Sequence, residues 1–183
     1  MRWDELFTDL EAQLAQAEAA ELAGEVSDRT RRETSLLAIT GRLGAAIGAD
    51  LVLHCEGVQQ LQGRLTEVGP DWLLLEEPGR AEALVSARHL VDVTGLTAAS
   101  EQQQGKVWRA LDLPWALRSL ARSRSAVQVL QCSGAARSGT LDRVGADFVE
   151  LAEHPPGEAR RRGAVSQVVL IAIEAISVVR SVS

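Results

Sequence analysis

Alternating apolar and polar positions occur in two stretches of the chain that match each other at a fixed distance. Residues 63–75 align without a gap to residues 139–151, an offset of 76, and six of the thirteen positions are identical. Farther along, residues 85–93 match residues 171–179 at an offset of 86, so the second copy has a loop ten residues longer. Because the matches keep their order, the sequence predicts an internal duplication.

Each copy has the pattern of five short strands with a tight turn before the last. In the first copy the strands are expected at residues 51–53, 63–68, 72–76, 84–85 and 90–93. In the second copy they are expected at residues 127–129, 139–144, 148–152, 165–171 and 176–179. The Val-Gly-x-Asp sequence ending at Asp71 and again at Asp147 is typical of a turn, in which Gly can adopt positive φ and Asp can bond to the local backbone. The apolar residues that this phase predicts to be buried are Leu65, Leu73, Leu75, Leu141, Val149 and Leu151.

Helical periodicity precedes each copy and also begins the chain. Residues 36–47 predict a helix that ends at Gly48, and residues 107–122 predict a second, kinked at Pro114. Near the N-terminus, Trp3, Phe7, Leu10 and Leu14 recur at the spacing of one helix face. This stripe predicts a helix that docks on its own chain or on another subunit.

A helix followed by five strands, with Gly-x-Leu-x-x-Val in the second strand, resembles the Sm-like branch of the SH3-like barrels. The resemblance implies an α+β fold: a long N-terminal helix followed by two Sm-like five-stranded β-barrels, each preceded by a helix. The expected divisions are residues 1–35 for the N-terminal helix, 36–96 for the first barrel, 97–105 for a linker and 106–183 for the second barrel. The overall arrangement also resembles uncharacterised proteins of high-GC Gram-positive bacteria.

The RNA pocket of the Sm family does not carry over to this chain. That pocket uses an aspartate followed by an asparagine in the turn between the second and third strands. Here Asp71 and Asp147 lie two positions later, and the chain contains no asparagine. Arg162-Gly163 matches the family's second motif in the second copy only.

Composition and charge place the chain among globular proteins. The net charge of −6 is uneven: residues 49–105 carry −6 and residues 106–126 carry +4. The apolar stretch at residues 165–179 is interrupted by Gln167 and Glu174 and is too short to span a bilayer. With only two cysteines, Cys55 and Cys132, the sequence predicts a cytoplasmic protein without a membrane segment.

No enzymatic constellation is visible in the sequence. His54, His89 and His154 lack a second ligand at metal-binding spacing, and the glycine-rich residues 41–48 lack the Gly-Lys-Ser/Thr ending of a phosphate-binding loop. No nucleophile motif occurs either. We therefore expect no catalytic residue, no cofactor and no metal.

Two surface features remain as candidates for function. Trp72 and Phe148 alternate out of phase with the predicted core and should point outward, where exposed aromatic residues often mark a protein interface. Arginines suited to phosphate contacts gather in the second half, at Arg118, Arg122, Arg124, Arg160, Arg161 and Arg162. The sequence thus predicts a non-enzymatic scaffold that binds an unidentified protein partner or associates with itself. An RNA-binding or other nucleic-acid-associated regulatory protein is the alternative.

Overall fold

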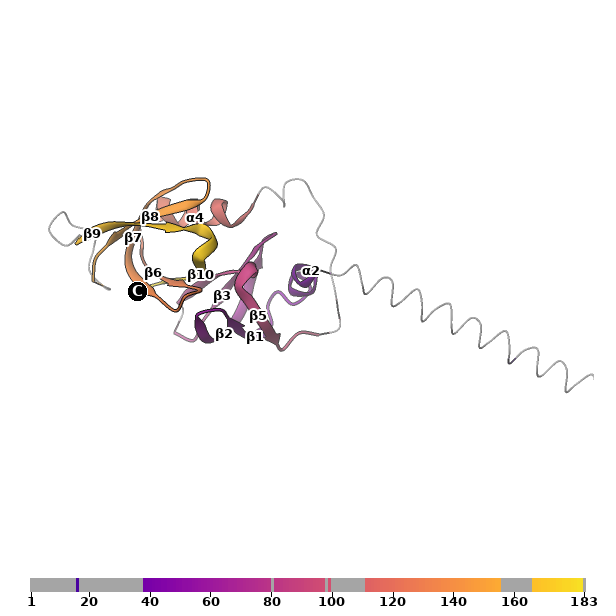
Figure 1. Cartoon of the computed structure of the whole chain (residues 1–183). Coiled ribbons are helices and arrows are strands. Elements are labelled where there is room, and N and C mark those ends of the chain that lie inside the picture. Colours follow the sequence, from indigo (N-terminus) through magenta and orange to yellow (C-terminus); the bar gives the residue numbers. More distant parts are fainter. Residues whose placement is uncertain are drawn as a thin grey trace, which may run out of the picture. The chain divides into compact units, whose positions relative to one another are not determined.

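The computed structural model describes residue 16 and residues 38–79, 81–97, 99, 111–155 and 166–182. Ile39–Ser183 form one compact unit, shown in Figure 1. Of the predicted N-terminal helix only Gln16 is described, and it is helical. The stripe of Trp3, Phe7, Leu10 and Leu14 and the triplet Arg160, Arg161 and Arg162 lie outside the described residues.

Each copy consists of a leading helix, five strands and one turn of 3-10 helix. The first copy contains α2 (Ile39–Gly44), β1 (Asp50–Cys55), β2 (Val58–Val68), β3 (Trp72–Glu76), β4 (Glu82–Ser86), η1 (Ala87–His89) and β5 (Leu90–Thr94). The second contains α4 (Leu113–Ser123), β6 (Ala126–Gln131), β7 (Ala136–Val144), β8 (Phe148–Glu153), β9 (Gln167–Ala172), η2 (Ile173–Ala175) and β10 (Ile176–Ser181). The strands of the two copies recur at the predicted offsets, so the fold contains the duplication that the sequence predicts.

The leading helices end alike. Gly48 and Arg124, which are 76 residues apart, both follow a helix and both have positive φ, at 91° and 52°. The second helix begins at Leu113. Asp112 is its N-cap residue, and the Asp112 carboxylate accepts a hydrogen bond from the Trp115 amide. Pro114 lies in the first turn, where its missing N–H costs no helical hydrogen bond. The predicted kink at Pro114 is therefore wrong, because the helix begins there.

The expected pair of five-stranded barrels is wrong. Within the described residues the ten strands form a single open antiparallel sheet, in the order β5-β1-β2-β3-β4-β10-β6-β7-β8-β9. Within each copy the fifth strand pairs with the first, so the outer edge of the fourth strand is left without a partner from its own copy. In the first copy this edge belongs to β4, and β10 of the second copy pairs with it. The two copies thereby share one sheet.

The junction between β4 and β10 is tied by side chains as well as by backbone hydrogen bonds. Arg180 on β10 forms a two-pronged ion pair with Glu77, with Nε 2.6 Å from Oε2 and Nη2 2.9 Å from Oε1. The Ser181 hydroxyl accepts a hydrogen bond of 2.8 Å from the Glu82 amide. Buried Val178 packs in the core of the first copy, whereas buried Leu84 packs in the core of the second. Each core is thus completed by the other copy.

The core predictions from strand alternation are confirmed. The six residues predicted to be buried are each at most 2% exposed: Leu65, Leu73, Leu75, Leu141, Val149 and Leu151. They divide between the two hydrophobic clusters, three in each. The period of two in the sequence therefore identified the inward face of the strands.

The glycines of the two Val-Gly-x-Asp turns serve a different purpose from the predicted one. Neither Gly69 nor Gly145 has positive φ. Instead, the ring of the aromatic residue three positions later lies where a Cβ would be, Trp72 over Gly69 and Phe148 over Gly145. The amide of each glycine donates a 2.8 Å hydrogen bond to the carbonyl of that same aromatic residue. Glycine is required here to make room for a ring.

We expect the substitution Gly69→Ala to lower the free energy of unfolding by about 1–3 kcal/mol, the usual cost of overpacking. The added Cβ would collide with the indole of Trp72, which is buried and hydrogen-bonded and so has little freedom to move. Gly145→Ala is the matched control, because its Cβ meets the half-buried ring of Phe148. Urea denaturation of both variants measures the difference. Equal losses would show that the fixed position of Trp72 is not what makes Gly69 necessary.

Candidate protein-interaction surface

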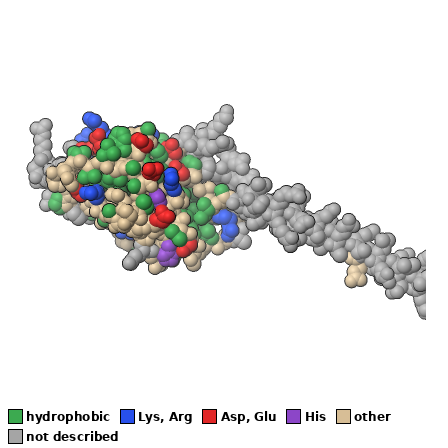
Figure 2. All heavy atoms as spheres, in the orientation of Figure 1, with side chains coloured by type: hydrophobic (Ala, Val, Ile, Leu, Met, Phe, Trp, Pro, Cys, Tyr) green, Lys and Arg blue, Asp and Glu red, His purple; other side chains and the backbone are tan. Residues whose placement is uncertain are grey.

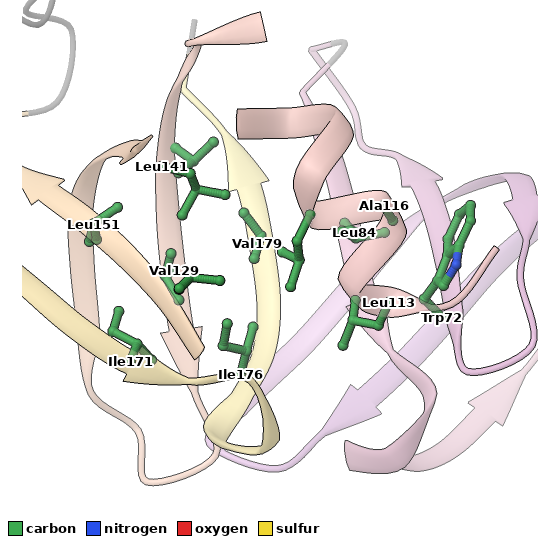
Figure 3. Close-up of a cluster of buried hydrophobic side chains, with 13 residues drawn as sticks. Trp72, Leu84, Leu113, Ala116, Val129, Leu141, Leu151, Ile171, Ile176 and Val179 are labelled. Atoms are coloured by element: carbon green, nitrogen blue, oxygen red, sulfur yellow. The ribbon is translucent and has the colours of Figure 1, made fainter. Parts of the chain in front are cut away.

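The first turns of helix α4 pack beside Trp72 of β3 and Leu84 of β4, in one buried cluster. Trp72 is only 5% exposed, and its indole Nε1 donates a 2.6 Å hydrogen bond to the carbonyl of Leu111. Figure 3 shows Leu113 and Ala116 of α4 beside Trp72 and Leu84 of the first copy. Alternation along the strand correctly placed Trp72 on the outer face. The expectation that its side chain is exposed is wrong, because a helix from the second copy covers it.

Two carboxylates fix the start of α4. Asp71, from the turn before β3, accepts a 2.8 Å hydrogen bond from the amide of Leu113. Asp112 accepts one of 3.0 Å from the amide of Trp115. Partial loss of solvent raises the pKa of Asp71 and the nearby Asp112 carboxylate raises it further, while the hydrogen bond from Leu113 offsets part of this rise. Asp71 thus joins the first copy to the helix of the second, a role that turn chemistry alone did not predict.

The corresponding face of the second copy has no helix over it in the described part of the chain. Leu170 on β9 occupies the place of Leu84 on β4; Leu84 is 4% exposed, but Leu170 is 63% exposed. Val168, two residues earlier on the same face, is 59% exposed, and Phe148 on the neighbouring strand is half-buried. We call Val168, Leu170 and the outer backbone of β9 the β9 edge.

The opposite end of the sheet shows the same contrast. Strand β5 is outermost there, and its Val91 is 64% exposed, whereas the corresponding Ser177 on β10 is fully buried. We call Val91 and the outer backbone of β5 the β5 edge. Among the described residues no strand pairs with the outer side of β5 or of β9. An unpaired strand with exposed aliphatic side chains is a ready site for pairing with another strand.

Hydrophobic side chains also gather on the face that Figure 2 displays, over the region of β8, β9 and α4. Beside α4 lies an apolar groove of about 410 Å³. Trp115, which is partly exposed, lies at this groove with Leu74 and Leu120. Residues of the first copy, such as Trp72 and Leu84, and residues of the second copy, such as Ala116 and Val179, line it together.

The described arginines of the predicted nucleic-acid contact lie on α4 and at its C-terminal cap. Arg118 donates a 3.1 Å hydrogen bond to the carbonyl of Gly145, and Arg122 donates one of 2.9 Å to the hydroxyl of Ser119. Arg124 is the helix C-cap residue. All three are exposed, but Arg118 and Arg122 have local structural partners.

A polar cluster that residue spacing did not predict lies where turns of the two copies meet. Nδ1 of His89 is 2.8 Å from Oε2 of Glu56, and its Nε2 is 2.7 Å from the backbone carbonyl of Glu174. The sulfur of Cys132 lies within 4.8 Å of ligand atoms of both Glu56 and His89. These residues come from separate turns, so no spacing motif could have revealed them.

Neither the sequence models of known protein families nor the curated proteins include a match to this chain. No helix within the described residues is long and apolar enough to cross a lipid bilayer.

Proposed function

We propose that this chain is a non-enzymatic assembly protein and that separate chains associate head to tail. The β9 edge of one chain pairs with the β5 edge of the next chain. The observation that carries the proposal is the pairing of β4 with β10 inside the chain, because β9 and β5 are the counterparts of those two strands in the duplication.

The internal junction supplies a register for the proposed contact. Inside the chain Leu84 is opposite Val179 and Val85 is opposite Val178. The counterparts of these residues in the duplication lie 86 positions away. At a contact between two chains they would place Leu170 of one chain opposite Val93 of the next, and Ile171 opposite Asp92. Both strands already have the length and the antiparallel direction that this pairing needs, since the equivalent strands make it once within every chain.

Burial supports the same arrangement. Residues of β4 and β10 that are buried have exposed counterparts on the strands at the sheet's ends. Leu84 is buried and its counterpart Leu170 is exposed, and Ser177 is buried and its counterpart Val91 is exposed. Burying an aliphatic side chain of this size contributes about 1.5–3 kcal/mol. A head-to-tail contact joins two different surfaces, so repeated association gives a ring if the rotation closes and a filament if it does not.

The two cysteines bear on the compartment in which the protein acts. Cys55 and Cys132 are both free thiols, as expected in a reducing compartment. We therefore place the assembly in the cytoplasm.

Light scattering on the full-length chain tests the association. We expect a mass above that of one chain, and we expect Leu170→Lys and Val91→Lys each to reduce it to the mass of a monomer, because a lysine on an edge strand opposes pairing. Gln62→Lys is the matched control, because it adds the same charge at an exposed position of the interior strand β2.

Mixing the two variants provides the sharper result. Val91→Lys retains an intact β9 edge and Leu170→Lys an intact β5 edge, so an equal mixture should form a pair of chains and nothing larger. Association of Val91→Lys with itself would indicate β9-to-β9 pairing and contradict the head-to-tail arrangement. Loss of association only on deletion of residues 1–20 would assign the contact to the N-terminal helix. A monomeric wild type that copurifies with nucleic acid, seen as a raised ratio of absorbance at 260 and 280 nm, would favour the RNA-binding alternative.

A further inference from the structure

The polar cluster between the two copies has the composition of a transition-metal site. It contains a thiol, an imidazole and a carboxylate, from Cys132, His89 and Glu56, and their ligand atoms all lie within 4.8 Å of one another. The whole chain has only three histidines and two cysteines. One of each meets here, although 43 residues separate them in the sequence.

The orientation of His89 fits a metal ligand. The ring is nearly buried and its Nε2 is held by the backbone carbonyl of Glu174 at 2.7 Å. Histidines that bind metals commonly donate their second ring N–H to a carbonyl or a carboxylate, which fixes the ring and directs the other nitrogen at the ion. In this cluster that other nitrogen is Nδ1, the one that faces Glu56.

The same orientation argues against a catalytic cysteine. A cysteine nucleophile needs a ring nitrogen within hydrogen-bond reach as its base, while the third residue holds the opposite nitrogen. Here Nδ1 faces the carboxylate of Glu56 and Nε2 faces the carbonyl of Glu174. Neither ring nitrogen is left to activate the sulfur of Cys132.

The distances and the surroundings allow an ion to enter. Tetrahedral zinc with Zn–N and Zn–O bonds of about 2.1 Å separates its nitrogen and oxygen ligands by about 3.4 Å. Nδ1 and Oε2 are now 2.8 Å apart, and the Glu56 side chain is 58% exposed, so it can withdraw by the required distance. An open pocket of about 520 Å³, which Arg88 and Glu174 also line, leaves room for water as the fourth ligand. The Arg88 guanidinium opposes a cation there, and the Glu174 carboxylate favours one.

We propose that Glu56, His89 and Cys132 bind a zinc ion that clips the β1–β2 turn and η1 of the first copy to the β6–β7 turn of the second. The thiol of Cys132 loses its proton on binding, Nδ1 of His89 and the Glu56 carboxylate supply lone pairs, and no redox step is involved. This proposal is independent of head-to-tail association, and it departs from the expectation of no metal drawn from residue spacing.

Competition for Zn²⁺ against a chromogenic chelator tests the site, with the full-length chain stripped of metal and free of any histidine tag. We expect one Zn²⁺ to bind per chain. The substitutions Cys132→Ser and His89→Gln should each weaken binding by more than the roughly 10–100-fold typical of outer-shell changes. His54→Gln is the matched control: His54 is exposed and its Nδ1 is 2.6 Å from Oδ1 of Asp92, away from the cluster. Circular dichroism verifies that each variant is folded, and if buried His89→Gln unfolds, the half-buried Cys132→Ser decides.

Thiol alkylation gives an independent measurement within one sample. Zn²⁺ should slow the reaction of Cys132 with iodoacetamide by about tenfold or more, because a bound thiolate is a poor nucleophile. Cys55 is the internal control: it is buried, and burial followed by the charge of Asp92 raises its pKa to about 11. Peptide mass spectrometry separates the two cysteines. Failure to compete with the chelator, or equal Zn²⁺ affinity in Cys132→Ser and wild type, would overturn the proposal.

Discussion

Replacing Trp72 with alanine should lower the free energy of unfolding by about 3–5 kcal/mol, the usual cost of removing a buried large aromatic side chain. Trp72 is 5% exposed and packs in the hydrophobic core of the second copy. Its indole N–H donates a hydrogen bond to the carbonyl of Leu111. The substitution would remove the surface on which α4 rests. Chemical denaturation followed by circular dichroism measures the loss.

Two further variants separate the reasons for that loss. Trp72→Phe keeps a ring in the cluster but cannot donate to Leu111, so we expect a smaller loss. Phe148→Ala is the matched control, because Phe148 occupies the equivalent position but is only half-buried. A loss in Phe148→Ala as large as in Trp72→Ala would show that packing under α4 does not distinguish the two aromatic residues.

Leu65→Ala and Leu141→Ala should each cost about 2–5 kcal/mol, as for other core leucines. The two residues occupy equivalent positions of β2 and β7 and are 0% and 2% exposed. Because β4 and β10 join the copies into one sheet, each variant should unfold in a single transition at a reduced midpoint.

Leu170→Ala is the control for these core variants. Its side chain is 63% exposed, so at low protein concentration we expect a change within about 0.5 kcal/mol. Unchanged midpoints in Leu65→Ala and Leu141→Ala would contradict the assignment of the core. Two separate transitions would contradict a shared sheet.

The surfaces proposed for interaction were predicted less completely than the strands. Trp72 and Phe148 were chosen because they alternate against the core, and that phase is correct for Trp72. Its burial could not be predicted, since it depends on a helix some forty residues later in the chain. The β9 edge was missed because Val168 and Leu170 lie in a run of apolar residues that is typical of a buried strand. Their exposure follows from the place of β9 at the end of the sheet.

The sequence by itself determined the duplication, the order of strands in each copy and the residues of the core. These features are local or periodic: alternation identifies the buried face of a strand, and Gly-containing turns separate the strands. Only the tertiary structure decided how the two copies join. Strand pairing also depends on which backbone edges meet in space, since any edge strand presents a row of unpaired N–H and C=O groups. In the part of the chain that the structure describes, the ten strands form one sheet with β5 and β9 at its ends. The same joining of the copies brings Glu56, His89 and Cys132 together from separate turns.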